Sequence, residues 1–331
     1  MITVTRRATL ATALASATAA CTRPTSFDHA AAPDHTVRAS YVPAGYYWPF
    51  LIVERAKLLE ERGYALDLIR VNSNSIMINS FLNGNLDVTA QSALTMFPLE
   101  LQHPGLYKYF YGQYLDSYFF MVRTESTYQR LQDLRGKRIA TWQSPTAINY
   151  LRLAFSSRGM DPDKDVTIVQ IGASSLAPTF ENSNDLDAVF GFDVPLARLA
   201  LTKKFRYIEE SIFSDINGGG KIFNGGGVIS TRTLLNDRAK ADAIAGAFND
   251  AIQLITSSRQ AAFEHLYSGL YGSSVPEDPA LFGAARLDDF RWVSPNLTAI
   301  AQQTYDLMRQ HGLIDAGQPL NVRSLFWSKE G

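Results

Sequence analysis

The fold is decided by the stretch from Val37 to Gln91, VRASYVPAGYYWPFLIVERAKLLEERGYALDLIRVNSNSIMINSFLNGNLDVTAQ. Apolar side chains alternate with polar ones in some segments and recur every three to four residues in others, with Gly and Asn between them. Strands are expected over residues 37–42, 66–71 and 86–91, and helices over 49–63 and 76–82. This order of elements predicts right-handed crossovers and a parallel sheet.

The same pattern returns after Asp133 and predicts a second α/β unit of similar build. Its expected strands are 139–142, 165–171, 186–192 and 205–210, and its expected helices are 145–159, 173–182 and 194–204. Beyond the glycine-rich stretch 218–227 the chain is mostly helical, over 231–256, 258–267 and 296–311. Because the first unit is short of helices, we expect these to return to it, so that the chain crosses twice between units, near 124–128 and near 221–228.

Composition limits the classes of function. A chain of 331 residues with 46% hydrophobic and 19% charged residues fits a well-packed protein of two domains. Residues 1–20 carry two Arg and no acidic residue, so their removal changes the net charge from −1 to −3. This mild acidity argues against nucleic acid as a partner, because such binding needs a basic face. No apolar run after Cys21 is long enough to span a bilayer.

The N-terminal residues have the layout of an export signal. Arg6 and Arg7 precede an uncharged run and then small residues up to Cys21, the single cysteine. We expect residues 1–20 to be a signal peptide, Cys21 to accept a lipid, and 21–36 to form a tether. The pair of arginines also resembles a twin-arginine signal, and the general and twin-arginine export routes stay open. The alternative is a disordered Ala-rich N-terminus of a cytosolic protein.

Several segments resemble a known family. In the first unit these are Ala44–Pro49, Leu59–Gly63 and Leu82–Val88; in the second they are Asp133–Ala140, Asp161–Val166 and Asp187–Phe190. They are similar in order and spacing to substrate-binding proteins of ABC importers in the nitrate/sulfonate/taurine group, with the related binders of thiamine-pyrimidine precursors. The resemblance extends from about residue 37 to about residue 270.

The resemblance implies an α/β fold of the periplasmic-binding-protein type II kind, with two lobes joined by two crossover strands and a ligand cleft between them. Lobe 1 would comprise 37–125 plus 225–331, and lobe 2 would comprise 126–224. The implied function is that of an exported, lipid-anchored monomer on the periplasmic or outer face of the membrane. It would deliver a small solute to an ABC permease and its ATPase, and the anchor would keep it near that permease.

Ligands of open parallel sheets bind beyond the carboxyl ends of the strands, where loops and helix N-termini meet. In the first unit the segments at these positions supply aromatic rings, amides and hydroxyls. The candidate ligand contacts there are Tyr46, Tyr47, Trp48, Asn74, Ser75, Gln91 and Ser92. One or two of the aromatics could instead complete the core, and the residues around Asn74 could serve only as a helix cap.

In the second unit the candidate contacts are Trp142, Gln143, Ser144, Thr146 and Asp193. Pro145 suits the first position of a helix, whose free N–H groups can hold an anionic oxygen without Lys or Arg. Ser144 could be only the N-cap of that helix. Asp193 follows a strand and would suit an amine or a ring N–H, or it could cap the next helix.

The glycine-rich stretch from Asn217 to Gly227 is not a phosphate-binding P-loop, because Ile222 follows Lys221 and the glycine spacing differs. We expect it to be a hinge between the lobes, with Asn224 as a further candidate ligand contact. The five histidines have no suitably spaced partners, so we expect no metal, no cofactor and no catalytic residue.

Two other functions stay open. A pyrimidine-precursor synthase shares the fold but uses a cysteine cluster, whereas this chain has only Cys21. A binding module of a sensor or of another transporter is the second alternative. The aromatic character of the candidate loops favours an organic ligand over bare nitrate, with organosulfonates and pyrimidine-like heteroaromatics ranked equally.

Overall fold

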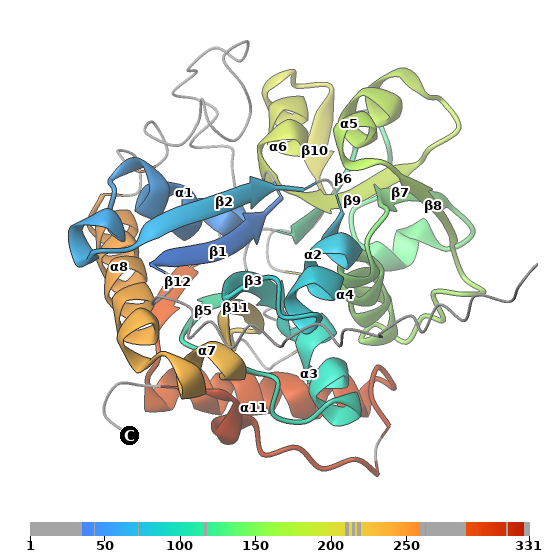
Figure 1. The fold of residues 1–331 in the computed structure, drawn as a ribbon. Coiled ribbons are helices and arrows are strands. Elements are labelled where there is room, and N and C mark those ends of the chain that lie inside the picture. Colours follow the sequence, from blue (N-terminus) through green and yellow to red (C-terminus); the bar gives the residue numbers. More distant parts are fainter. Residues whose placement is uncertain are drawn as a thin grey trace, which may run out of the picture. The chain divides into compact units, whose positions relative to one another are not determined.

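The computed structural model describes residues 35–42, 44–71, 73–115, 118–208, 212–213, 216, 220–258, 262, 289–315 and 317–327. The predicted signal peptide, Cys21 and nearly all of the predicted tether lie outside these residues, as does most of the predicted helix 258–267. The described part contains two β-sheets, each with its own helices (Figure 1). We call the first sheet with its helices the first unit and the second sheet with its helices the second unit.

The first sheet has seven strands within the described residues, in the order β12-β5-β11-β3-β1-β2 with β4 paired to β11. Its parallel part is formed by β1 (Thr36–Tyr41), β2 (Ala65–Arg70) and β3 (Val88–Ser92). Its antiparallel part is formed by β4 (Tyr107–Tyr109), β5 (Tyr111–Tyr114), β11 (Phe223–Ser230) and β12 (Asp289–Trp292). The three predicted strands of the first unit are confirmed.

The helices of the first unit come from both ends of the chain. They are α1 (Trp48–Arg55), α2 (Asn74–Leu82), α3 (Ala93–Gln102), α7 (Thr231–Asn236), α8 (Arg238–Ser257) and α11 (Pro295–Gln310). Helix α8 packs against α1, and α11 packs against α3 and β11 (Figure 1). The described late helices α7, α8 and α11 therefore pack on elements of the first unit.

The predicted helix over 49–63 is too long. Helix α1 ends at Arg55, and Lys57 adopts a left-handed φ of 55°, which an α-helix does not tolerate. A short 3₁₀ turn at Glu60–Arg62 follows, and Gly63 ends it with a φ of 81°. This irregular turn lets Leu59, which is 1% exposed, reach the core.

The second sheet has the order β10-β6-β9-β7-β8. Its parallel strands are β7 (Arg138–Trp142), β8 (Thr167–Ile171) and β9 (Ala188–Phe192), and β6 (Tyr118–Arg123) and β10 (Phe205–Tyr207) pair antiparallel at one side. Its helices are α4 (Pro145–Ser156), α5 (Ala173–Asn182) and α6 (Asp193–Leu201). All of these elements except β6 match predicted elements in type and approximate position.

The parallel parts of the two units repeat one another down to single hydrogen bonds. The Arg38 N–H donates to Asp87 Oδ2 and the Asp87 N–H donates to the Arg38 carbonyl, both at 2.9 Å. The same two bonds join Arg138 and Asp187, again at 2.9 Å each. Each aspartate thus ties the start of the third parallel strand to the first, which confirms two similar units in tandem.

The chain passes from the first sheet to the second between Tyr114 and Tyr118, earlier than the predicted crossing near 124–128. It returns between Tyr207 and Phe223. Residues 225–227 belong to the fully buried strand β11 rather than to a hinge loop. A Cβ on Gly226 would lie 2.2 Å from the Tyr111 carbonyl oxygen, so this part of the glycine run serves close packing inside the sheet.

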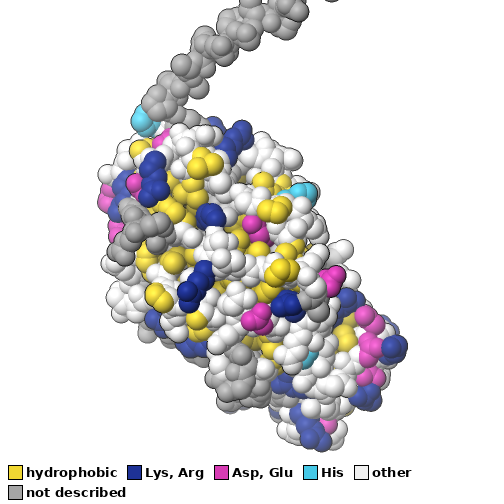
Figure 2. Space-filling model, turned by 90° about the horizontal axis from the view of Figure 1, so that it is seen from below, with side chains coloured by type: hydrophobic (Ala, Val, Ile, Leu, Met, Phe, Trp, Pro, Cys, Tyr) yellow, Lys and Arg dark blue, Asp and Glu magenta, His cyan; other side chains and the backbone are white. Residues whose placement is uncertain are grey.

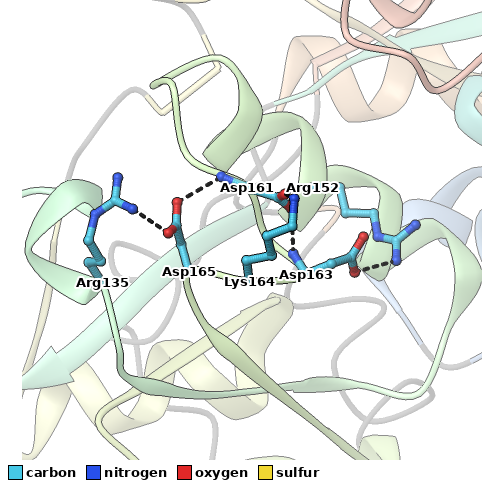
Figure 3. A network of polar contacts seen from close by, with 6 residues as sticks. All are labelled: Arg135, Arg152, Asp161, Asp163, Lys164 and Asp165. Atoms are coloured by element: carbon cyan, nitrogen blue, oxygen red, sulfur yellow. Dashed lines mark hydrogen bonds and ion pairs between the residues drawn. The ribbon is translucent and has the colours of Figure 1, made fainter.

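The loop between α4 and β8, which contains the resembling segment Asp161–Val166, is held by ion pairs between oppositely charged side chains (Figure 3). Asp161 Oδ2 accepts from Lys164 Nζ at 2.6 Å, and Asp163 Oδ1 accepts from Arg152 at 2.7 Å. Asp165 pairs with Arg135 and also accepts from the Asp161 N–H at 2.8 Å. The hydrogen bond from Lys164 is the main reason that the pKa of Asp161 is lowered. These carboxylates therefore bind partners within the loop, on α4 and at Arg135.

One large hydrophobic cluster runs through both units, and a smaller one lies within the second unit. Tyr118 and Ile222 belong to the large cluster and lie at the two chain passages, so the core is continuous there. On the face in Figure 2, Lys and Arg side chains are interspersed with Asp and Glu, and neither charge forms a large continuous patch among the described residues. None of the described helices combines the length and hydropathy needed to cross a bilayer.

Candidate functional site

The two units meet at Tyr150, a fully buried residue of α4. Its hydroxyl donates to Asn224 Oδ1 of β11 at 2.6 Å and accepts from the Ser92 hydroxyl at 3.4 Å. Ser92 ends β3 and caps α3, since its Oγ accepts from the Leu94 N–H at 3.3 Å. A chain of hydrogen bonds therefore extends from one helix N-terminus in the first unit, through a second-unit side chain, to the neighbouring strand.

A second contact lies one helical turn away. The hydroxyls of Thr95 on α3 and Thr146 on α4 are 2.9 Å apart. Thr146 and Tyr150 are four residues apart on α4 and so share one face of that helix. The N-terminal halves of α3 and α4 thus face each other through hydrogen-bonding groups, at the carboxyl ends of β3 and β7 where the sequence predicts the ligand.

Tyr46 contributes a buried hydroxyl to this region. Its pKa is raised well above its ordinary value, first by burial and then by the neighbouring Tyr109, Tyr47, Tyr111 and Tyr150 hydroxyls. The Tyr46 hydroxyl has no hydrogen-bond partner among the described residues, and neither does that of Tyr109. Buried hydroxyls without partners are costly, which makes them candidates for contact with a ligand or water.

Gln91 and Ser144, near strand ends of the two units, also have buried polar atoms without hydrogen-bond partners among the described residues. Gln91 is 2% exposed, and neither its amide oxygen nor its amide nitrogen has a partner in the described part of the chain. Ser144 is 3% exposed and precedes α4, yet its hydroxyl makes no capping bond. An amide that can both donate and accept, together with a free hydroxyl at a helix N-terminus, can hold a ligand with mixed polarity.

Aromatic rings form the second-unit side of the site. Trp142 is half-buried at the end of β7, with its ring centroid 5.0 Å from that of Phe192. The Tyr118 ring lies 5.0 Å from Phe192 and 4.8 Å from Tyr150. These rings offer a stacking surface for a planar or apolar ligand next to the hydrogen-bonding groups.

The structure separates the predicted site residues into groups. Ser92, Thr146 and Asn224 make hydrogen bonds between the units, and Tyr46, Gln91 and Ser144 have buried polar atoms without described partners. Tyr47 and Trp48 are core residues, and the Tyr47 hydroxyl donates to the Ala90 carbonyl at 3.0 Å. Ser75 and Gln143 are exposed, Asn74 begins α2, and the side chain of Asp193 lies outside the description.

Sequence reasoning missed Tyr150 and Thr95. Tyr150 occurs inside a predicted helix, where an aromatic residue normally indicates core. The available signal was its spacing of four residues from Thr146, which places both on the face of α4 next to the predicted site.

The contacts described above join Tyr150 to the uncharged side chains of Asn224, Ser92 and Tyr118. Burial and neighbouring tyrosines account for the shifted pKa of Tyr46, with no Lys, Arg, Asp or Glu among the causes. Within the described ranges, no group of three or more His, Cys, Asp or Glu side chains is placed to hold a metal ion. The groups described here offer hydrogen bonding and stacking.

A separate pocket of about 370 Å³ lies beside β6 and β10, lined in part by Arg123, Glu181 and Lys203. The Arg123 guanidinium donates to the carbonyls of Leu186 and Ser183 and lies 5.2 Å from the Phe180 ring centroid. Its charge is therefore used to hold the second unit together.

A comparison with protein families decides the family. The family model described as NMT1/THI5 like matches residues 60–253, which is more than half of the chain. The chain belongs to the NMT1/THI5-like family. No curated protein sequence gives a significant match.

Solved structures share the fold of this NMT1/THI5-like protein. The periplasmic aliphatic sulphonate-binding protein SsuA from Escherichia coli is 17% identical, with a TM-score of 0.70 over 89% of this chain and 98% of that one. The alkanesulfonate-binding protein SsuA from Xanthomonas axonopodis pv. citri, bound to MOPS, is 18% identical, with a TM-score of 0.70 over 90% and 99%. The periplasmic-binding-protein type II-like fold expected from the sequence is confirmed.

One neighbour with the same fold is an enzyme. The desulfurization enzyme DszB is 16% identical, with a TM-score of 0.61 over 89% of this chain and 96% of that chain. Within the NMT1/THI5-like fold, therefore, the architecture alone does not separate a binding protein from an enzyme.

Proposed function

We propose that the chain is an exported solute-binding protein of an ABC importer. It would bind a small organic solute between the two units and deliver it unchanged to a membrane permease and its ATPase. Family membership supports this proposal, as does the fold shared with sulfonate-binding proteins along nearly their whole length. The proposed lobes are the two units, with the boundaries refined to the chain passages before Tyr118 and before Phe223.

The observation that carries the proposal is the set of buried polar atoms without described partners, on segments of both units that meet around Tyr150. The Tyr46 hydroxyl, the Gln91 amide and the Ser144 hydroxyl are its members. Burying such groups unpaired costs about 1–3 kcal/mol each. A solute that supplied their partners would recover this free energy and so favour the closed arrangement of the units.

The proposed solute has a planar or apolar body and an uncharged or delocalised polar end. The Trp142 and Phe192 rings would contact the body, and the Gln91 amide and the N-terminus of α4 would contact the polar end. Organosulfonates and pyrimidine-like heteroaromatics both meet this description. Asp193, Asn74, Ser75, Gln143, Tyr47 and Trp48 stay as predicted contacts.

Export and anchoring are part of the proposal. Residues 1–20 would direct export, Cys21 would carry a lipid, and 21–36 would tether a monomeric receptor at the membrane surface. Mass spectrometry of the protein purified from membranes tests this directly, since a lipidated Cys21 adds the mass of its acyl chains and a Cys21→Ser variant would lack it.

A thermal-shift screen tests the binding function. The panel comprises alkanesulfonates, taurine, aminopyrimidines and nitrate. A solute at 100 times its Kd should stabilise the folded protein by about 2.7 kcal/mol. The Gln91→Met variant should fold at least as stably when empty, because it removes an unpaired buried amide, and should bind about tenfold or more weakly. A shift with nitrate alone would contradict an organic solute.

The same samples distinguish a receptor from an enzyme of this fold. After incubation with any solute that gives a shift, the solute is recovered and analysed by mass spectrometry. Quantitative recovery of the unchanged compound is expected. A new product that increases with time would refute a purely binding role.

A further inference from the structure

Tyr150 is built to connect the two units rather than to stabilise the second unit alone. Its ring belongs to α4, but its hydroxyl bonds to two first-unit side chains within the described residues, Ser92 and Asn224. These partners lie on adjacent strands, since Ser92 pairs with Gly225 in the β3–β11 register. The Tyr150 hydroxyl is therefore held between two neighbouring strands of the opposite unit.

The inter-unit contact along α4 contains several hydrogen bonds between side chains. Thr146 and Tyr150 present hydroxyls to Thr95 and Ser92, and Asn224 is 1% exposed. Water can satisfy each of these groups if α4 moves away from α3, so separation exposes no orphaned polar atom. An apolar contact of the same size would lose buried area on opening. Hydrogen-bonded contact thus suits two units that come together and part.

We propose that Tyr150 is a positioning residue that holds the units together at the site, so that closure is stabilised in part by protein–protein hydrogen bonds made without the solute. This proposal rests on the proposed function, because it expects the two units to move relative to each other about the two chain passages. It assigns Ser92, Thr146 and Asn224 a role that differs from direct ligand contact. Removing the Tyr150 hydroxyl would favour the open arrangement and weaken binding of any solute without removing a solute contact.

The test uses the empty protein, so it does not depend on knowing the solute. Spin labels are placed at exposed positions of the two units, through Asn184→Cys and Leu235→Cys with Cys21→Ser, and their distances are measured by pulsed electron paramagnetic resonance. Tyr150→Phe should lower the ratio of the closed to the open distance population about tenfold, which corresponds to the loss of about one strong hydrogen bond. Thr146→Val should shift it in the same direction.

Tyr107→Phe is the matched control. Tyr107 is also fully buried, and its hydroxyl donates to the Met96 carbonyl at 2.9 Å within the first unit. It should lower stability without changing the distance distribution. Two results would overturn the inference: distributions for Tyr150→Phe and Thr146→Val equal to that of the parent, or an equal shift with Tyr107→Phe. A confirmed shift together with no solute in the screen would leave the inference standing and the proposed function refuted.

Discussion

At the residue scale, Asp87 and Asp187 show how one position acquires different importance in two similar units. Both carboxylates accept from the backbone of the first parallel strand. Asp87 also accepts from Thr233 at 2.9 Å and from Lys240 at 3.2 Å, and the Lys240 side chain is only 6% exposed. Asp187 accepts instead from the Tyr128 hydroxyl at 2.9 Å, and Lys137 lies farther away, at 3.9 Å.

We therefore expect Asp87→Asn to destabilise the protein more than Asp187→Asn. The first substitution removes the carboxylate that pairs with the buried Lys240 ammonium, and breaking such a buried ion pair costs about 3–5 kcal/mol. The second weakens hydrogen bonds at a more open site and should cost about 1–2 kcal/mol. Urea denaturation of both variants measures the difference. Equal losses of stability in the two variants would show that another group balances the charge of Lys240.

Glu100 gives a prediction on pH. This residue is 7% exposed, and burial raises its pKa above the ordinary value of 4.5, against the opposing effects of the Gly105 N–H and Lys108. The folded protein therefore holds this proton to a higher pH than the unfolded chain does. The stability that this pKa shift of Glu100 contributes is fully present below about pH 4.5. It is lost as the pH rises through the pKa of Glu100 in the folded protein.

Replacing Glu100 by Gln should remove this loss. The glutamine oxygen can still accept from the Gly105 N–H, which donates to Glu100 Oε1 at 2.7 Å in the wild type. The variant should gain stability relative to the wild type as the pH rises from 5 to 8 in urea titrations. A constant difference across that range would mean that Glu100 titrates normally.

At the element scale, strand β11 depends on having no side chains at three successive positions. A Cβ on Gly225 would lie 2.1 Å from the Gln91 carbonyl oxygen, and the residue has a φ of 112°. A Cβ on Gly227 would lie 2.1 Å from the Tyr111 ring. The strand therefore packs closely against β5 and the end of β3, and Asn224, next to Gly225, accepts from Tyr150.

Gly226→Ala should cost at least about 3 kcal/mol or prevent folding, because the backbone of β5 would have to move. Gly172→Ala is the control, since a Cβ there has nothing within 4 Å and the residue precedes α5 with a φ of −59°. It should cost about 1 kcal/mol or less. Thermal unfolding of both variants provides the measurement. Similar losses of stability in the two variants would mean that the first sheet can widen at β11 to accept a side chain.

At the scale of the whole molecule, the two units share one hydrophobic cluster although they have separate sheets. The cluster contains Phe97 of the first unit and Phe120 of the second, and it is continuous at the chain passages. Motion between the units is therefore expected to leave these passages packed and to separate mainly the polar contact between α3 and α4.

The shared cluster predicts a single cooperative unfolding transition. The four tryptophans report on both units, since Trp142 lies in the second unit and Trp48, Trp292 and Trp327 lie in the first. Fluorescence and circular dichroism curves in guanidinium should coincide. In a Trp142→Phe variant, fluorescence from the first unit alone should follow the same curve. A midpoint that differed between the probes would show that the units unfold independently.

The sequence by itself determined the tandem α/β units and the carboxyl-end segments at which the site is proposed. Hydrophobic periods and turn residues are local, so they could be recognised without knowledge of distant partners. Only the tertiary structure decided that α1 stops at Arg55, that Gly225 to Gly227 form a buried strand, and that Tyr150 joins the units. Those features depend on which side chains meet across long sequence separations, and local patterns carry no information on such packing.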